Sequence, residues 1–180
     1  MTITQRTPTT RNVLLVGESL ESLRGLQTQP GVLLARGSSV ACPEPTAAVI
    51  QLDLSTAISR KEFNRRLCAQ IPLCLGICAQ APSIENILLV VQGPAALPES
   101  LLHESCERLG DRIHWNIEQH CGIYVVLTIP IVNGCDDYSL LADRVWHRAH
   151  QPQGIDATTT IAWGEIKEKP IEQSAANDYL

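Results

Sequence analysis

Continuous apolar runs constrain the fold of this chain more than any other feature of its sequence. Residues 12–17, 32–35 and 47–54 are three such runs, and a short amphipathic segment at residues 18–27 separates the first two. Runs of this kind, without polar alternation, are typical of strands buried on both faces of a parallel sheet. The first third of the chain is therefore predicted to form a parallel α/β unit.

The rest of the chain shows a second pattern of elements. A helix capped by Ser55 or Ser59 is expected to run to Pro72, and residues 85–91 form another buried strand. A helix over 97–109 follows, and then a hairpin over 112–130 with its tip at 118–122. A helix opened by Asp136 or Asp137 and a strand over 157–163 complete the series. From residue 85 the predicted order is β-α-β-β-α-β, which is the ferredoxin-like arrangement.

Composition and charge exclude several classes of protein. The net charge of −5 argues against broad nucleic-acid binding, and aromatic residues make up only 4% of the chain, so the core must be aliphatic. No run of 18 apolar residues is present, and the polar start of the chain lacks the apolar stretch of a secretory signal. We therefore expect a cytoplasmic protein whose seven Cys are reduced thiols.

The sequence Arg108-Leu109-Gly110-Asp111 is the strongest candidate site, because it lies between the predicted helix and the predicted hairpin. The Arg fork can donate to one edge of a guanine while the Asp accepts from another. The simpler interpretation is an Arg at a helix C-terminus, with Gly110 as the residue that ends the helix. Arg112, on the following strand, would add positive charge near the phosphates of a nucleotide.

Other polar residues offer weaker candidates. Arg144 and Arg148 lie four residues apart on a predicted helix, where a solvated face is the favoured interpretation. Cys74 and Cys78 lack the usual zinc spacing, and Cys in apolar surroundings behaves as a small hydrophobe. A Cys–His hydrolase using Cys121 or Cys135 is disfavoured, because nothing identifies an orienting partner or an oxyanion hole. No cofactor and no metal ligands are therefore expected.

The order of elements resembles the GGDEF domain of diguanylate cyclases over roughly residues 53–178. Residues 53–67 look like the segment that opens that domain, and Thr158-Thr-Thr-Ile-Ala-Trp-Gly164 looks like its later strand. The signature tip of the hairpin is degenerate, since residues 118–122 read Glu-Gln-His-Cys-Gly. The strand over 85–91 is followed by Gln92 rather than a metal-binding Asp. Two-metal phosphoryl chemistry needs such carboxylates, so no enzyme activity is expected.

The resemblance nevertheless retains an inhibitory-site motif ahead of the predicted hairpin. An Arg-x-Gly-Asp form of this motif in a non-catalytic relative is similar to the GIL (GGDEF I-site-like) domain of the bacterial cellulose-biosynthesis protein E family. The resemblance implies a cyclic di-GMP-binding regulatory protein whose ligand contacts Arg108, Leu109, Gly110, Asp111 and Arg112. It further implies a protein partner such as a cellulose-synthase complex. Arg24 or Arg36 is a candidate to complete the site.

In that family a degenerate receiver-like module precedes the degenerate GGDEF domain, and residues 12–54 look like a piece of such a receiver. The expected architecture is therefore α/β: a mobile tail at 1–11, a truncated receiver-like βαβ module at 12–54, and a degenerate GGDEF-like domain at 55–180. Two alternatives stay open. The protein is a scaffold that has lost nucleotide binding, or it is an unrelated small α/β enzyme that uses its Cys and His residues.

Overall fold

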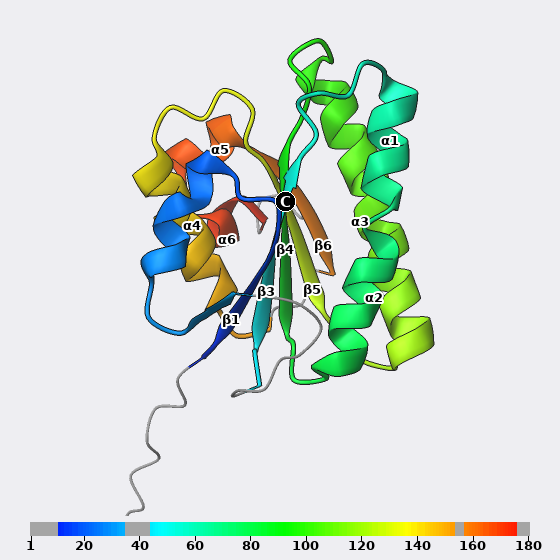
Figure 1. Ribbon diagram of the computed structural model, residues 1–180, viewed down its shortest axis with the longest axis vertical. Coiled ribbons are helices and arrows are strands. Elements are labelled where there is room, and N and C mark those ends of the chain that lie inside the picture. Colours follow the sequence, from blue (N-terminus) through cyan, green and yellow to red (C-terminus); the bar gives the residue numbers. More distant parts are fainter. Residues whose placement is uncertain (1–10, 35–43, 154–156, 176–180) are drawn as a thin grey trace, which may run out of the picture.

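A computed structural model describes residues 11–34, 44–153 and 157–175 of the chain (Figure 1). Apart from Arg11, the tail predicted at residues 1–11 lies outside the described residues, and so does Arg36. Within the described residues, one central sheet is covered by helices on both faces. The prediction of an α/β protein is confirmed.

The sheet has six strands in the order β2-β1-β3-β4-β5-β6, and every neighbouring pair is parallel. The interior strands β3, β4 and β5 are buried almost throughout, as continuous apolar runs require. The strands are β1 (Val13–Gly17), β2 (Val32–Leu34), β3 (Ala47–Asp53), β4 (Asn86–Gln92), β5 (Val126–Ile131) and β6 (Thr158–Ala162).

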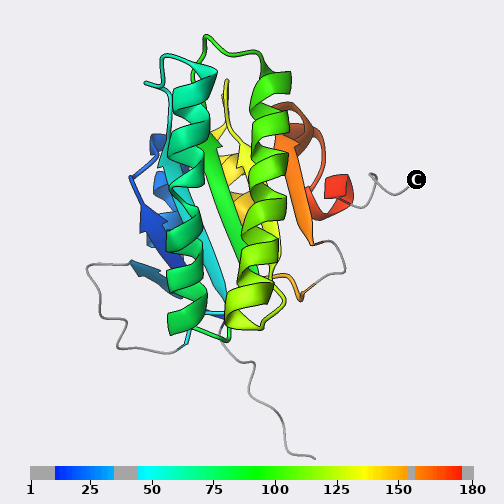
Figure 2. The ribbon, with the colours of Figure 1, turned by 90° about the vertical axis from the view of Figure 1, so that its right-hand side faces the viewer.

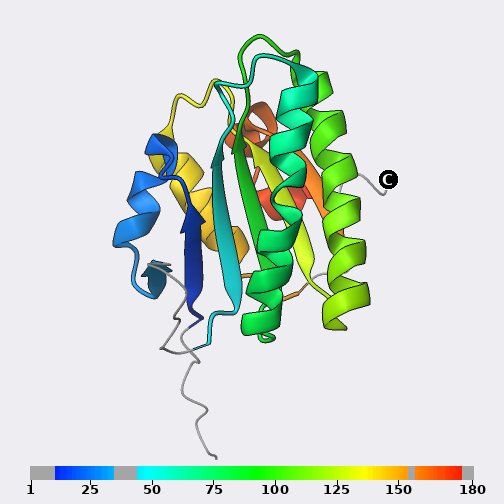
Figure 3. The same ribbon diagram turned by 45° about the vertical axis from the view of Figure 1, so that its right-hand side comes forward.

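Helices divide into two layers, which Figure 1 shows on the two sides of the sheet. One layer holds α1 (Arg60–Cys68), α2 (Ile71–Gln80) and α3 (Glu99–Cys121), and α1 and α2 follow one another beside the longer α3 (Figure 3). The other layer holds the 3₁₀ helix η1 (Glu21–Thr28), α4 (Tyr138–Ala149), α5 (Trp163–Glu168) and α6 (Ile171–Ala175).

Each layer of helices encloses its own apolar core, because successive side chains of a strand point to opposite faces. In β4, Leu89 belongs to the core under α1, α2 and α3, whereas its neighbours Leu88 and Val90 belong to the core under η1 and α4. Both cores are mainly aliphatic, as the low aromatic content predicts. The central strands β3, β4 and β5 are therefore shielded from water on both faces.

Hydrogen bonds from capping side chains determine where α1 begins. The Ser59 hydroxyl accepts a hydrogen bond from the Glu62 backbone N–H at 3.2 Å, and the Glu62 carboxylate accepts one from the Ile58 N–H at 3.1 Å. Ser59, rather than Ser55, is thus the cap. The expectation that Pro72 stops this helix is wrong, since α1 ends at Cys68 and Pro72 lies in the first turn of α2, where its missing N–H is not needed.

The predicted hairpin over 112–130 is wrong in its first strand. Residues 112–117 continue α3, which ends only at Gly122, a residue with φ of 67°. The apolar side chains inside α3 recur every three or four residues, and this helical period outweighs the short alternation that favoured a strand. They are Leu102, Cys106, Leu109, Ile113 and Ile117. Gly110 therefore lies within a helix and does not end one.

The ferredoxin-like arrangement is consequently absent from the described residues, because β4, β5 and β6 are mutually parallel and each pair is joined through a helix. The boundary predicted between residues 54 and 55 also has no counterpart in the sheet. Strands on either side of it, β3 and β4, are paired over seven residues, from Ala47↔Asn86 to Asp53↔Gln92. Both parts of the chain contribute to one sheet and to the same two cores.

The connection from β5 to β6 has the opposite hand from the two connections that precede it. The chain moves in the same direction along the sheet from β3 to β4, from β4 to β5 and from β5 to β6. The first two crossovers pass over the face of α1, α2 and α3 (Figure 2), but the third passes over the opposite face, where α4 packs against η1. The crossover β5-α4-β6 is therefore left-handed, whereas nearly all such connections are right-handed.

Candidate functional site

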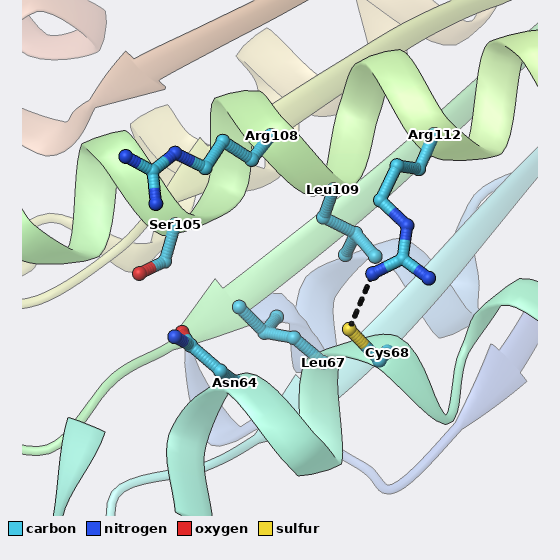
Figure 4. A pocket seen from close by; sticks show the side chains of 7 residues that line it. All are labelled: Asn64, Leu67, Cys68, Ser105, Arg108, Leu109 and Arg112. Atoms are coloured by element: carbon cyan, nitrogen blue, oxygen red, sulfur yellow. Dashed lines mark hydrogen bonds between the residues drawn. The ribbon is translucent and has the colours of Figure 1, made fainter. Parts of the chain in front are cut away.

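A pocket between α1 and α3 is lined by several polar side chains, two of them from the predicted site (Figure 4). It has a volume of about 250 Å³. Its floor is the apolar pair Leu67 and Leu109, which fix the packing of the two helices. Around this floor lie Asn64 and Cys68 from α1, and Ser105, Arg108 and Arg112 from α3. We call this the α1–α3 pocket.

Two oxygens that line the α1–α3 pocket have no hydrogen-bond partner among the residues that the structure describes. They are Oδ1 of Asn64 and Oγ of Ser105, and each is itself shielded from solvent. Ser105 is only 7% exposed, so its hydroxyl is not satisfied by bulk water. Figure 4 shows these two side chains facing each other from α1 and α3. Because buried polar groups nearly always have a partner, the pocket is chemically suited to a polar guest.

Two arginines supply positive charge to the same pocket. The Arg112 guanidinium donates to Sγ of Cys68 at 3.3 Å, and a thiol is a weak acceptor. Arg108 bonds to the Glu104 carboxylate, which also accepts from Arg60 at 2.7 Å. Glu104 thus links α1 to α3. Arg108 is largely exposed, and among the described residues the Arg112 side chain bonds only to a thiol, so both can turn toward an anion.

The structure separates the predicted site residues into two groups. Arg108, Leu109 and Arg112 line the α1–α3 pocket, but Gly110 and Asp111 lie on the side of α3 that packs on β6. The Asp111 carboxylate accepts from the Thr158 hydroxyl at 3.0 Å. A Cβ at Gly110 would lie 3.4 Å from Ile129 Cδ1, so this glycine serves helix–sheet packing. Arg108 and Asp111 therefore make separate contacts in the structure, and the guanine clamp stays a prediction.

Other arginines proposed from the sequence lie elsewhere. Arg24 is on η1, and Arg144 and Arg148 are on α4, so all three belong to the opposite layer. Arg148 is buried and donates from Nε to the Thr128 hydroxyl at 3.1 Å, which is a structural role. The favoured solvated face is therefore wrong for Arg148. His114, two residues after Arg112 on α3, contacts the Val125 carbonyl at 3.1 Å and the ring of Tyr124.

Cysteines in the described part of the chain are mostly packing residues. Burial raises the pKa of Cys74 and of Cys106 to about 12, and burial together with nearby Cys121 raises the pKa of Cys78 to about 12. These groups are therefore protonated near neutral pH and are poor nucleophiles or ligands. No group of three or more His, Cys, Asp and Glu side chains within residues 11–34, 44–153 and 157–175 could hold a metal ion.

A second group of hollows lies where the strands end. In open parallel sheets, ligands commonly bind outside the carboxyl ends of the strands, where the strand order reverses. Asp53, at the end of β3, lines two pockets of about 330 and 320 Å³, one with Arg65 and Arg66 and the other with Gln92. Its Oδ1 already accepts from the backbone and the hydroxyl of Ser55. No unpartnered buried side-chain atom is found at these pockets among the described residues.

Sequence reasoning missed Asn64 and Ser105, the two side chains that define the polar lining of the α1–α3 pocket. They are 41 positions apart and come together only because α1 packs on α3. A partial signal was available within α3, since Ser105, Leu109 and Arg112 follow the three- and four-residue spacing of one helix face. Nothing in the local sequence of α1 marks Asn64.

Comparisons of the chain with protein-family models, with characterised proteins and with solved structures find no match. None of the helices in the described part of the chain is both long and apolar enough to cross a membrane. The functional assignment therefore depends on the geometry of the α1–α3 pocket and on the resemblance of the sequence.

Proposed function

We propose that the protein is a non-catalytic regulatory protein that binds a phosphate-bearing nucleotide in the α1–α3 pocket, with cyclic di-GMP as the first candidate ligand. The observation that carries this proposal is the coincidence of two arginines with two unpartnered oxygens around one pocket. Arg108 and Arg112 supply charge-assisted donors for phosphate oxygens. Ser105 offers an unused hydroxyl donor for phosphate, and Asn64 offers an unused Oδ1 acceptor for a donor group of the ligand.

Cyclic di-GMP comes from the resemblance to the GIL domain, and the pocket changes how such a ligand would be held. Asp111 already bonds to Thr158, and we therefore place the phosphates rather than a guanine at the arginines. The arginines instead hold phosphate, and a base contacts the surface beside the pocket. By the same resemblance, the bound state would alter docking onto a cellulose-synthase complex. Such regulation requires two states of the protein, docked and undocked or docked in different ways, that differ in affinity for the ligand.

The test is isothermal titration calorimetry with cyclic di-GMP, GTP and inorganic pyrophosphate. Arg108→Ala and Arg112→Ala should each weaken binding about 10- to 100-fold, as expected when one hydrogen bond to a charged group is lost. Arg24→Ala is the matched control, because it removes an exposed arginine on the opposite face of the sheet, and it should bind like the wild type.

Two results would overturn the proposal. If none of the three ligands binds the wild-type protein at millimolar concentration, the scaffold alternative is favoured. If binding is unchanged in the Arg108→Ala/Arg112→Ala double variant, the ligand occupies another site, and the pockets around Asp53 become the next candidates. Turnover of GTP in the presence of Mg²⁺ would contradict the non-catalytic assignment.

A further inference from the structure

The size of the α1–α3 pocket limits what it holds. Its volume of about 250 Å³ is below the range of roughly 300–1,000 Å³ typical of sites that enclose a whole small-molecule ligand. A nucleotide whose phosphate reaches Arg108 and Arg112 must therefore leave its base outside. The base then lies on the outer surface of α3, so the residues of that surface determine what kind of ligand is favoured.

Trp115 is the large aromatic side chain of that surface. It is 59% exposed, which is unusual for a residue that is mostly buried in folded proteins. It follows Arg112 by three residues and Arg108 by seven, so all three lie on one face of α3. No ring contact or hydrogen bond is recorded for its indole among the described residues.

Helix geometry brings the indole toward the pocket. Three residues of α-helix rise about 4.5 Å, so the Trp115 Cα is less than one turn from that of Arg112. Side chains on a helix lean toward its N-terminus, a general tendency that directs Trp115 toward the turn containing Asp111 and Arg112. An aromatic face thus lies next to a cationic pocket in which the buried Ser105 hydroxyl has no partner.

We propose that Trp115 is the base-stacking platform of a nucleotide whose phosphate is held by Arg108 and Arg112. This inference rests on the proposed function and adds the ligand class, an aromatic base joined to a phosphate. A base stacks on an indole through its π-face, and a phosphate one sugar away meets the arginines. Such stacking tolerates any base, so the platform favours nucleotides over phosphates that lack a base.

The experiment compares 5′-GMP with ribose 5-phosphate, which carries the same sugar and phosphate without a base. Trp115→Leu should weaken GMP binding roughly 5- to 100-fold and leave ribose 5-phosphate binding unchanged. Trp115→Phe keeps an aromatic face and should retain most of the GMP affinity. GMP, but not ribose 5-phosphate, should quench tryptophan fluorescence in the wild type, and the quench should be lost in Trp115→Phe.

The outcomes separate this inference from the proposed function. If both probes bind equally and depend on Arg108, the phosphate site stands and the stacking role of Trp115 is overturned. The same holds if Trp115→Leu leaves GMP affinity unchanged but abolishes self-association of the protein, which would make the indole a protein-docking residue. If neither probe, nor cyclic di-GMP, binds the wild type, the proposed function fails and the stacking role fails with it.

Discussion

Glu104 is the residue that controls the charge of the α1–α3 pocket. Its carboxylate is bonded to both Arg60 and Arg108, so in the ligand-free protein it stands where a ligand anion would compete. Glu104→Gln removes that competing charge and leaves a side chain of the same shape. Because exposed ion pairs contribute at most about 1 kcal/mol, we expect phosphate-bearing ligands to bind about two- to five-fold more tightly.

The measurement is again calorimetry with GMP or cyclic di-GMP. Glu107→Gln is a suitable control, since Glu107 lies on the same helix but faces His103 rather than the arginines. Weaker binding by Glu104→Gln than by the wild type would show that Glu104 positions Arg108 for the ligand instead of competing with it.

At this scale the sequence predicted part of the site. The local pattern of charge and glycine predicts a site at Arg108, Leu109 and Arg112, and these three residues line one pocket. Asp111 was assigned to the same site because a turn was expected at Gly110. The residue Gly110 lies inside α3 instead, and Asp111 bonds to Thr158 of β6, a contact that only the tertiary fold creates.

At the scale of elements, one ion pair connects the loop after β5 to α5. The Asp136 carboxylate accepts from Lys167 at 2.6 Å and from the Trp163 indole N–H at 3.0 Å. The hydrogen bond from Lys167, with that from Trp163, lowers the pKa of Asp136 below its ordinary 3.8. The same bond raises the pKa of Lys167 above 10.5. The contact is therefore complete across the neutral range.

Asp136→Asn should lower the free energy of unfolding at pH 7. A depressed carboxyl pKa stabilises the fold above the unfolded value, and this contribution is lost as pH falls through the folded pKa, which lies below 3.8. The difference between wild type and variant should therefore disappear in strong acid. Urea unfolding at pH 7, 5 and 2, followed by tryptophan fluorescence, measures it. Asp143→Asn, an exposed change on α4, is the control, and a difference that persists at pH 2 would contradict the argument.

The buried strands and the helix α3 differ in how well the sequence predicts them. β1, β3 and β4 were predicted nearly to the residue, because strands buried on both faces have an unambiguous apolar sequence. The second half of α3 is not predicted as a helix, because Ile113, Trp115 and Ile117 alternate with polar residues as the side chains of a strand do. Only the longer period back to Leu102 identifies the helix, and the packing of α3 across β5 and β6 stabilises it.

At the scale of the whole molecule, the apolar core under α1, α2 and α3 predicts the reactivity of the thiols that it contains. Cys74, Cys78 and Cys106 are buried and protonated, so in the folded protein they should resist alkylation by iodoacetamide at pH 8. Cys68 and Cys121, which are partly exposed, should react first. Mass spectrometry of peptides after timed labelling checks this order.

Labelling in urea is the control for this prediction, because unfolding should make all these thiols equally reactive. Alkylation of Cys74 at the rate of Cys68 in the folded protein would indicate that α2 opens readily from the sheet.

The left-handed connection from β5 to β6 has a consequence for solubility. β5 is buried along its whole length, and its outer edge is covered only because β6 pairs with it from Leu127↔Thr158 to Ile131↔Ala162. The usual twist of the chain does not direct a strand to that place, so the contacts of α3 with β6 have to hold it there. A chain shortened before residue 157 would present an apolar, unpaired strand edge, which is a template for aggregation. In this sense β6 is a protective edge strand. The helix α3, which forms one wall of the α1–α3 pocket, also holds β6 against β5.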